Sequence, residues 1–176
     1  MLASSAQAAF HLWTIRELFT NLDGSQQFIE LFCPTSSQTF VSGQQIRVTD
    51  QANTTTHTFT IPANVPGDTT NRAYLIATSA FAAAPGAVTP DAIVPSGFLF
   101  PAGGTISFFG TPSSIVYTAL PTNGILSRVV PGSANQVNSP QNYAGQTGQV
   151  VPEPTTWALL GMGGVGCCFL MRRRAA

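Results

Sequence analysis

Short runs of alternating apolar and polar residues, separated by turn-forming residues, occupy most of the first 130 positions. The clearest is at residues 55–61, where His57, Phe59 and Ile61 share one side and the intervening threonines share the other. Seven runs of this kind are predicted strands: residues 9–18, 27–33, 45–49, 55–61, 72–78, 104–109 and 115–118. Because the prolines fall between these runs, ladder hydrogen bonding is preserved. The pattern predicts an all-β sandwich over residues 10–130.

The segments between the runs carry turn signals. Asn21-Leu22-Asp23-Gly24 contains an Asp-Gly pair and predicts a type I′ hairpin turn between the first two strands. Residues 80–97 are expected to form a long loop, with a turn of helix at residues 79–84. Beyond Arg128 the chain is rich in Gly, Ser, Asn, Gln and Pro, which predicts a flexible polar linker over residues 131–150.

The C-terminal segment has a different pattern. Between Glu153 and Arg172 lie 18 residues without a charge, which as a helix would rise about 27 Å, close to the hydrocarbon thickness of about 30 Å. Arg172, Arg173 and Arg174 follow directly and favour the cytoplasmic side of a membrane. Residues 155–171 are therefore predicted to form a single transmembrane helix that leaves the body on the opposite side.

Val151, Pro152, Glu153 and Pro154, then residues 155–171, then the three arginines together resemble the PEP-CTERM sorting signal. The resemblance covers residues 151–174 and implies recognition by an exosortase, a membrane-embedded enzyme with a cysteine nucleophile that removes the helix and releases the body to the outer surface. The prolines deny helix geometry just outside the span and leave an extended, accessible segment.

Export is a requirement of such sorting. Ala6-Gln7-Ala8, followed by Ala9, has the small-residue form of a signal-peptidase site, and we interpret residues 1–9 as the remnant of a signal peptide. The expected localisation is export and anchoring in the inner membrane with the body in the periplasm. After processing, the body is expected at the cell surface or outside the cell.

The body carries a second resemblance. Residues 10–15, the turn at 21–24, and residues 27–31, 58–62 and 120–124 look like a lamin-tail-type domain. This similarity spans residues 10–130 and implies an immunoglobulin-like β-sandwich, a fold used mostly for binding and scaffolding. Such domains share no catalytic residues, so none is carried over to this chain.

Composition narrows the functions. Only 8% of the residues are charged and lysine is absent, so no basic surface is available for a phosphate backbone and nucleic-acid binding is not expected. Residues before Val151 carry four arginines and six acids, which makes the body mildly acidic. Cys33 is the single cysteine of the body and is interpreted as a small buried hydrophobe.

Few residues offer chemistry. The body has two histidines and lacks the hydrolase, zinc-protease and phosphate-loop motifs, so we expect no enzyme, no cofactor and no transition-metal site. Asn21, Asp23 and Ser25, with Glu30 nearby, are a weak candidate for a Ca²⁺ site. The alternative is that these residues only form a type I′ hairpin turn. Glu30 itself, between two phenylalanines, is predicted to be paired with Arg16 or Arg47 in a structural role.

Two functions remain open. The first is an exported, non-catalytic surface or extracellular-matrix protein whose partners are exopolysaccharide, the envelope or other surface proteins. The alternative is a glycan- or protein-binding module displayed at the surface, in which aromatic side chains serve as platforms. The aromatic candidates are Trp13, Tyr74, Tyr117 and Tyr143.

Overall fold

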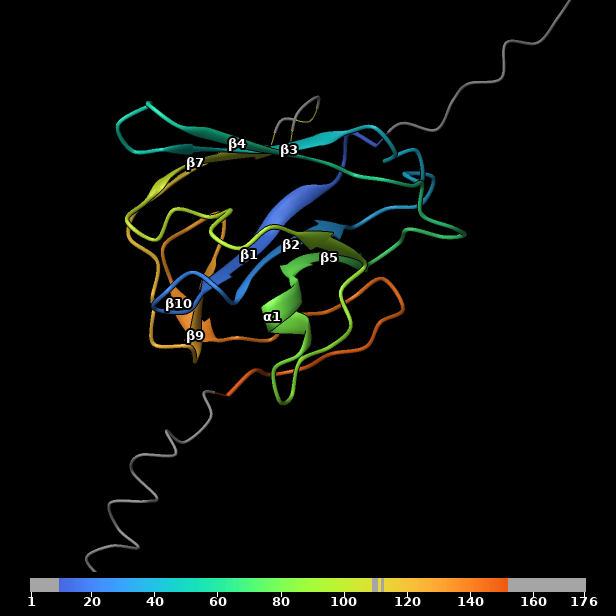
Figure 1. Cartoon of the computed structure of the whole chain (residues 1–176). Helices are drawn as coiled ribbons and strands as arrows, with labels where there is room; N and C mark the ends of the chain where they lie inside the picture. Colours follow the sequence, from blue (N-terminus) through green and yellow to red (C-terminus); the bar gives the residue numbers. More distant parts are fainter. Residues whose placement is uncertain (1–9, 109–110, 112, 152–176) are drawn as a thin grey trace, which may run out of the picture.

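Two β-sheets pack face to face, and a short helix with the C-terminal part of the body covers the outer side of one of them (Figure 1). This computed structural model describes residues 10–108, 111 and 113–151. The layers follow the predicted alternation, since each strand of the four-stranded sheet turns one row of side chains inward and the other to solvent. The all-β, two-sheet architecture is thus confirmed.

The larger sheet has six strands and runs antiparallel except at one edge, where the last strand is parallel to its neighbour. In spatial order its strands are β10 (Asn135–Val137), β9 (Leu126–Val129), β1 (Thr14–Thr20), β2 (Gln27–Cys33), β5 (Arg72–Thr78) and β6 (Ala92–Val94). The helix α1 (Ser79–Ala82) follows β5 directly, and the hydroxyl of Thr78 accepts a hydrogen bond from Phe81 N at its start (3.2 Å).

The smaller sheet has four antiparallel strands, with β4 and β8 at its edges. In spatial order these are β4 (Thr56–Thr60), β3 (Gln45–Asp50), β7 (Gly104–Phe108) and β8 (Ser114–Tyr117). Ile46, Val48 and Ile106 point into the molecule and are fully buried. Thr58 lies opposite Arg47 on the outer side, where both are exposed.

Two apolar clusters hold the layers together. The main cluster lies between the sheets and includes the fully buried Trp13, Ile15 and Phe108. The second lies on the outer side of the six-stranded sheet, where Phe19 and Phe28 stack with ring centroids 5.2 Å apart. Phe81 of α1, together with Val88 and Val150, closes this second cluster. The central strands β1, β2 and β5 are therefore buried on both faces, which explains their apolar runs.

All seven predicted strands are present, and a helical turn forms at residues 79–82 as expected. The bounds agree within about two residues, except that β1 begins at Thr14, five residues after the predicted start. Three further strands were not predicted. β6 lies within residues 80–97, which the sequence favoured as a loop, and β9 and β10 lie near the end of the body. Each has three or four residues, which is too short for a period of two to stand out.

The hairpin turn between β1 and β2 differs from the prediction. A type I′ turn needs positive φ at both central residues, but Gly24 is left-handed (φ 70°) whereas Leu22 and Asp23 are not. Gly24 N donates to Asn21 O (3.3 Å), and Asn21 N donates to Gln26 O (3.0 Å). The connection is therefore a type I turn followed by a left-handed glycine, in a loop longer than two residues.

A larger correction concerns residues 131–150, which were predicted as a flexible linker. They fold onto the body: β10 pairs with β9, Asn138 and Val150 are 1% exposed, and the chain crosses beneath α1. Polar composition suggested a tether, but the buried side chains of Asn138 and Asn142 hydrogen-bond to backbone carbonyl groups of the body and hold the segment, while most of its other side chains stay exposed.

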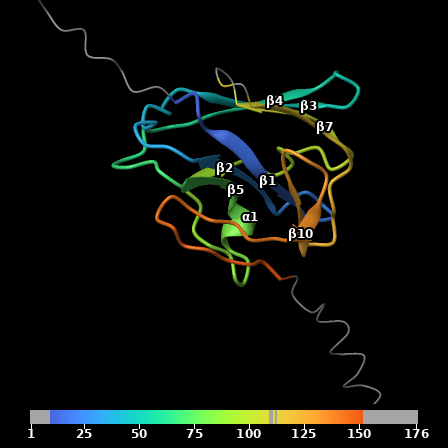
Figure 2. The ribbon, with the colours of Figure 1, turned by 180° about the vertical axis from the view of Figure 1, so that it is seen from behind.

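The ends of the chain fall outside the described residues. These comprise the expected signal-peptide remnant at 1–9, Pro152, Glu153 and Pro154 of the motif, the span at 155–171 and the arginines at 172–174. Among residues 10–151, as far as they are described, no helix combines the length and the apolar character needed to cross a bilayer. The described chain begins beside the four-stranded sheet and ends below α1, on opposite sides of the molecule (Figures 1 and 2).

Candidate functional site

The last part of the body, residues 138–151, runs across the outer side of the six-stranded sheet and leads to the C-terminal tail (Figures 1 and 2). We call this segment the strap. It contains a tight turn, in which Asn142 N donates to Gln146 O (3.0 Å) and Gln141 bridges Thr147. From that turn the chain returns along the body to Val150. The strap thus decides where the tail leaves the folded domain.

Three carboxylates of the body hold the first half of the strap. Every second residue in this part of the strap donates its backbone N–H to one of the three carboxylates. The spacing is that of hydrogen bonds to an adjoining β-strand. The bonds run from Ser139 N to Glu17 Oε1 (3.1 Å), from Gln141 N to Glu30 Oε2 (2.6 Å) and from Tyr143 N to Asp91 Oδ2 (2.9 Å). The carboxylate oxygens therefore accept the hydrogen bonds that backbone carbonyl oxygens of a neighbouring strand would accept in a β-sheet.

Glu17 and Glu30 are direct cross-strand neighbours in β1 and β2, and they are 2% and 0% exposed. Two like charges at this spacing repel each other unless donors surround them. Arg16 forms an ion pair with Glu30 and also lies over the ring of Phe32, 4.5 Å from its centroid. Ser127 Oγ donates to Glu17 (2.5 Å). The repulsion is thus offset by donors that include the strap's own backbone.

Burial changes the acidity of two of these groups. Desolvation raises the pKa of Glu30 above its ordinary value, against the lowering effect of Arg16 and Gln141, and the nearby Glu17 adds to the rise. Desolvation also raises the pKa of Asp91, although the N–H groups of Leu75 and Tyr143 favour its charged form. Two of the carboxylates that hold the strap therefore lie where burial disfavours their charged form.

Asn138 fixes the other end of the strap. Its Nδ2 donates to Val150 O (2.9 Å) and to Ile125 O (2.7 Å), while its Oδ1 accepts from Val150 N (2.8 Å). Both backbone polar groups of Val150 are thus satisfied by one buried side chain. Because the Val150 side chain is also part of the second apolar cluster, the chain is firmly attached to the body two residues before Pro152.

Two glycines allow the strap to approach the turn after α1. Gln149 N donates to Gly86 O (3.0 Å), and a Cβ atom on Gly86 would lie 2.2 Å from Gln149 O. A Cβ on Gly148 would in turn lie 2.6 Å from Gly86 O. The close contact of the two backbones therefore depends on glycine at both positions.

Gly86→Ala is expected to lower the free energy of unfolding by about 2–3 kcal/mol, because its positive φ (78°) adds strain to the overlap with Gln149 O. Gly67→Ala is the matched control, since Gly67 has φ 68° but nothing within 4 Å of its added Cβ. It should cost only about 1 kcal/mol. Urea unfolding of the full chain measures both values, and equal losses would contradict the close contact.

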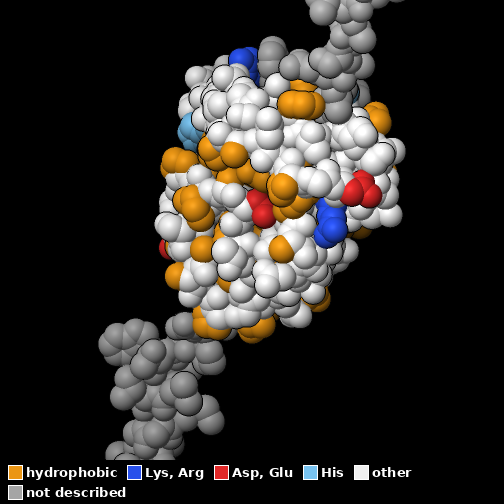
Figure 3. Space-filling view, turned by 90° about the vertical axis from the view of Figure 1, so that its right-hand side faces the viewer, with side chains coloured by type: hydrophobic (Ala, Val, Ile, Leu, Met, Phe, Trp, Pro, Cys, Tyr) orange, Lys and Arg blue, Asp and Glu red, His pale blue; other side chains and the backbone are white. Residues whose placement is uncertain are grey.

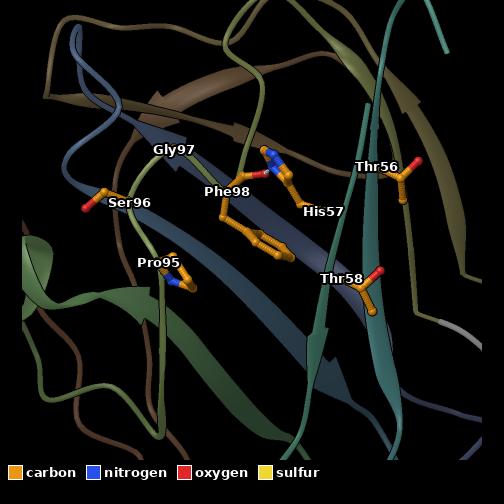
Figure 4. A pocket seen from close by; sticks show the side chains of 7 residues that line it. All are labelled: Thr56, His57, Thr58, Pro95, Ser96, Gly97 and Phe98. Carbon is orange, nitrogen blue, oxygen red and sulfur yellow. Dashed lines mark hydrogen bonds between the residues drawn. The ribbon is translucent and has the colours of Figure 1, made fainter. Parts of the chain in front are cut away.

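A separate pocket of about 300 Å³ opens between β4 and the loop at residues 95–98 (Figure 4). His57 points toward this loop, and its Nδ1 lies 2.9 Å from Phe98 O, while Thr56 and Thr58 extend from the other side of the strand. The His57 ring stacks on Phe100 at 4.6 Å between centroids. The full lining is Thr56, His57, Thr58, Pro95, Ser96, Gly97 and Phe98. Such a surface offers hydroxyl, backbone and ring contacts without a charged group.

The residues that the sequence singled out are mostly structural in the described body. Glu30 pairs with Arg16, one of its two predicted partners, rather than with Arg47. At the weak calcium candidate, Asp23 Oδ1 accepts from both Ser25 N (3.0 Å) and Ser25 Oγ (2.7 Å). These local bonds lower the pKa of Asp23. No group of three or more His, Cys, Asp or Glu residues is placed for a metal within the described ranges.

Three of the four aromatic candidates are core residues and not platforms. Trp13, Tyr74 and Tyr117 are 0%, 6% and 3% exposed, and burial raises the pKa of both tyrosines to about 12. Tyr143 is half-buried in the strap, where its hydroxyl donates to Pro66 O (2.6 Å). All three belong to the main apolar cluster between the two sheets, which the sequence pattern alone did not distinguish from an open surface.

Sequence reasoning missed Glu17, Asp91 and Asn138. A signal for Glu17 exists: two polar residues, Arg16 and Glu17, separate the inward-facing Ile15 and Leu18, as a β-bulge requires, and the β1–β2 register shifts there. Asp91 and Asn138 lie in loop-like sequence and gave no signal of their own.

The described body is thus an all-β, two-sheet domain whose final segment is bound to it and ends at the start of a tail. Residues 150–174 match the PEP-CTERM protein-sorting motif. This chain therefore carries that motif, which confirms the resemblance of its tail and indicates a protein sorted by an exosortase to the cell surface. No curated protein and no solved structure shows a match to the chain.

Proposed function

We propose that this chain is an exported, non-catalytic surface or extracellular-matrix protein. In this proposal residues 155–171 anchor it in the inner membrane, Arg172, Arg173 and Arg174 stay on the cytoplasmic side, and an exosortase processes it at Val151–Pro154. The observation that carries the proposal is the sorting motif, which begins directly at the end of the folded body. The lamin-tail-like character of residues 10–130, and with it a scaffolding role, is part of the same proposal.

Support for a non-catalytic role comes from how the body uses its reactive groups. Three acids hold the strap, and the other three accept hydrogen bonds that close turns, which lowers their pKa values. These turn acids are Asp23, Asp50 and Asp68. Cys33 is buried, and its Sγ lies 3.2 Å from Thr35 O. If these groups took part in a reaction, they would lose the hydrogen bonds that they make in the folded body, which costs free energy.

Cell fractionation tests the proposal. Each tagged chain is given a complete signal peptide and made in a host that contains an exosortase. The full chain should then appear processed in the outer-surface or extracellular fraction. A chain lacking residues 151–176 should be released without processing. A chain in which Pro152, Glu153 and Pro154 are replaced by alanine should remain unprocessed in the inner membrane, since the span and arginines are kept. A cytosolic, soluble full chain would overturn the proposal.

The pocket beside β4 favours the alternative of a displayed glycan-binding module. Its volume is near the lower end for small-ligand sites, which suits one sugar unit. The half-buried ring of His57 and the backbone of the loop at residues 95–98 supply the apolar and polar contacts that a sugar uses. The pocket also lies away from the strap, so that anchoring at the tail leaves it open.

Titration with D-glucose, D-galactose and D-glucuronate, followed by NMR chemical shifts, tests this alternative. Binding should perturb the His57 resonances, and His57→Ala should weaken it at least about tenfold, since removing the ring opens the wall of the pocket. Thr105→Ala is the control, because Thr105 lies in β7 on the outer side of the same sheet and outside the pocket. Absence of binding by all three sugars would exclude a site of this type.

A further inference from the structure

The strap determines which side of the body faces the membrane. Asn138 binds both backbone groups of Val150, so the chain is held to the folded domain up to two residues before the motif's first proline, Pro152. If residues 155–171 span the bilayer, as the proposed function holds, only residues 151–154 separate the fixed Val150 from the span. Four residues reach at most about 14 Å even when fully extended.

The surface around Val150 is uncharged. Residues 79–88 and 148–151, which we call the exit face, contain no charged residue. The two segments are joined by the hydrogen bond from Gln149 N to Gly86 O, and Val88 and Val150 share the second apolar cluster. The exposed members are small or uncharged: Ser79, Ala82, Ala83, Pro85, Gly86, Gln149 and Val151. This face carries nothing that anionic headgroups would repel.

The opposite side of the molecule lies away from the point where the tail leaves the body. The four-stranded sheet lies on the far side of the six-stranded sheet from α1 and the strap (Figures 1 and 2). Figure 3 shows one flank of the body, on which charged side chains are sparse among uncharged polar and apolar atoms. No basic patch competes with the tether in setting orientation, since the described body has four arginines and no lysine.

We infer that the exit face is a membrane-facing surface. Before processing, it lies against the lipid headgroups and the four-stranded sheet points away from the bilayer. This inference rests on the proposed anchoring but adds the orientation, which a flexible linker would not impose. Because an extended tether of about 14 Å cannot pass around a folded domain, the orientation persists as long as the Asn138 contact with Val150 is intact.

Fluorescence quenching in liposomes tests the orientation. Full chains with Cys167→Ala and Cys168→Ala carry one label, either at Ala82→Cys on the exit face or at Thr58→Cys on β4. Both sites are exposed, and Cys33 is buried and unlabelled. The liposomes are phosphatidylethanolamine and phosphatidylglycerol with a headgroup quencher. Quenching at position 82 should exceed that at position 58 several-fold.

Two variants test whether the short tether after Val150 is what orients the body. A Gly/Ser insert of about 20 residues after Val151 adds a root-mean-square length of about 25 Å, and the difference between the labels should disappear. Asn138→Asp, without the insert, should reduce the difference because the end of the strap is released. Equal quenching in chains that float with the liposomes would overturn the inference. Failure of the chain to float would instead overturn the proposed anchoring.

Discussion

Replacing Glu30 with alanine is expected to lower the free energy of unfolding by about 3 kcal/mol, the lower end for breaking a buried ion pair. The lower end applies because the Arg16 side chain is 35% exposed and regains some hydration. The loss has two parts: Arg16 loses its carboxylate, and Gln141 N loses its acceptor at the start of the strap turn. Urea unfolding of the full chain, followed by near-ultraviolet circular dichroism, measures it.

Asp68→Ala is the matched control for this substitution. Asp68 is also a carboxylate that accepts a backbone hydrogen bond, from Thr70 N (2.9 Å), but it is fully exposed. Its removal deletes the same chemical group without leaving a buried donor, so it should lower the free energy of unfolding much less than Glu30→Ala does. Equal losses for the two variants would contradict a structural role for Glu30.

The cost of Glu30→Ala should also depend on pH. Because burial raises the pKa of Glu30, its contribution to stability is fully present below its ordinary pKa of 4.5 and decreases as the pH rises through the folded-state value. The stability difference between the natural chain and Glu30→Ala should therefore be larger near pH 4 than at about pH 7. Exposed acids with lowered pKa values, such as Asp50, change stability in the opposite direction. They are common to both chains and cancel in the difference.

Alternation along the chain was sufficient to predict the two sheets. In Thr56–Thr60 one face is half-buried and the other is exposed, so the period of two is visible in the residue types. In β2 six of seven residues are buried, so burial does not follow the period of two there, and the Asp-Gly turn before the strand supported its prediction. The sorting motif of the tail was predictable for a different reason, since the order of the Pro-Glu-Pro residues, the uncharged stretch and the arginines is a property of the sequence and does not depend on the fold.

The strap was not predictable from the same signals. Its residues are those of a linker, and what holds them is a set of acids at positions 17, 30 and 91, far away in sequence. A Glu in a strand is ordinarily read as facing solvent. At Glu17 the bulge changes the face, and at Glu30 the partner strand and the strap close over the carboxylate. Only the tertiary arrangement brings donors to these groups.

Asn138→Asp is expected to release the end of the strap while leaving the sheets folded. An aspartate is nearly the same size and can still accept from Val150 N, but it has no N–H to donate. Its charge would face the carbonyl oxygens of Ile125 and Val150, which Asn138 Nδ2 now approaches at 2.7 and 2.9 Å. A buried charge that faces two carbonyl oxygens costs more than a lost neutral hydrogen bond.

Hydrogen exchange measures this release residue by residue. Amide exchange at Gln149 and Val150 should become about 100-fold faster in Asn138→Asp, which corresponds to a loss of nearly 3 kcal/mol in local opening. Exchange in β2 and β5 should change much less, since their ladders do not involve the strap end. Asn64→Asp is the matched control, because exposed Asn64 only accepts from Ser42 N (2.9 Å) and an aspartate keeps that bond. If Asn138→Asp left Val150 as protected as Asn64→Asp does, the apolar contacts of Val150 would be sufficient to hold the strap, and the role assigned to Asn138 would be wrong.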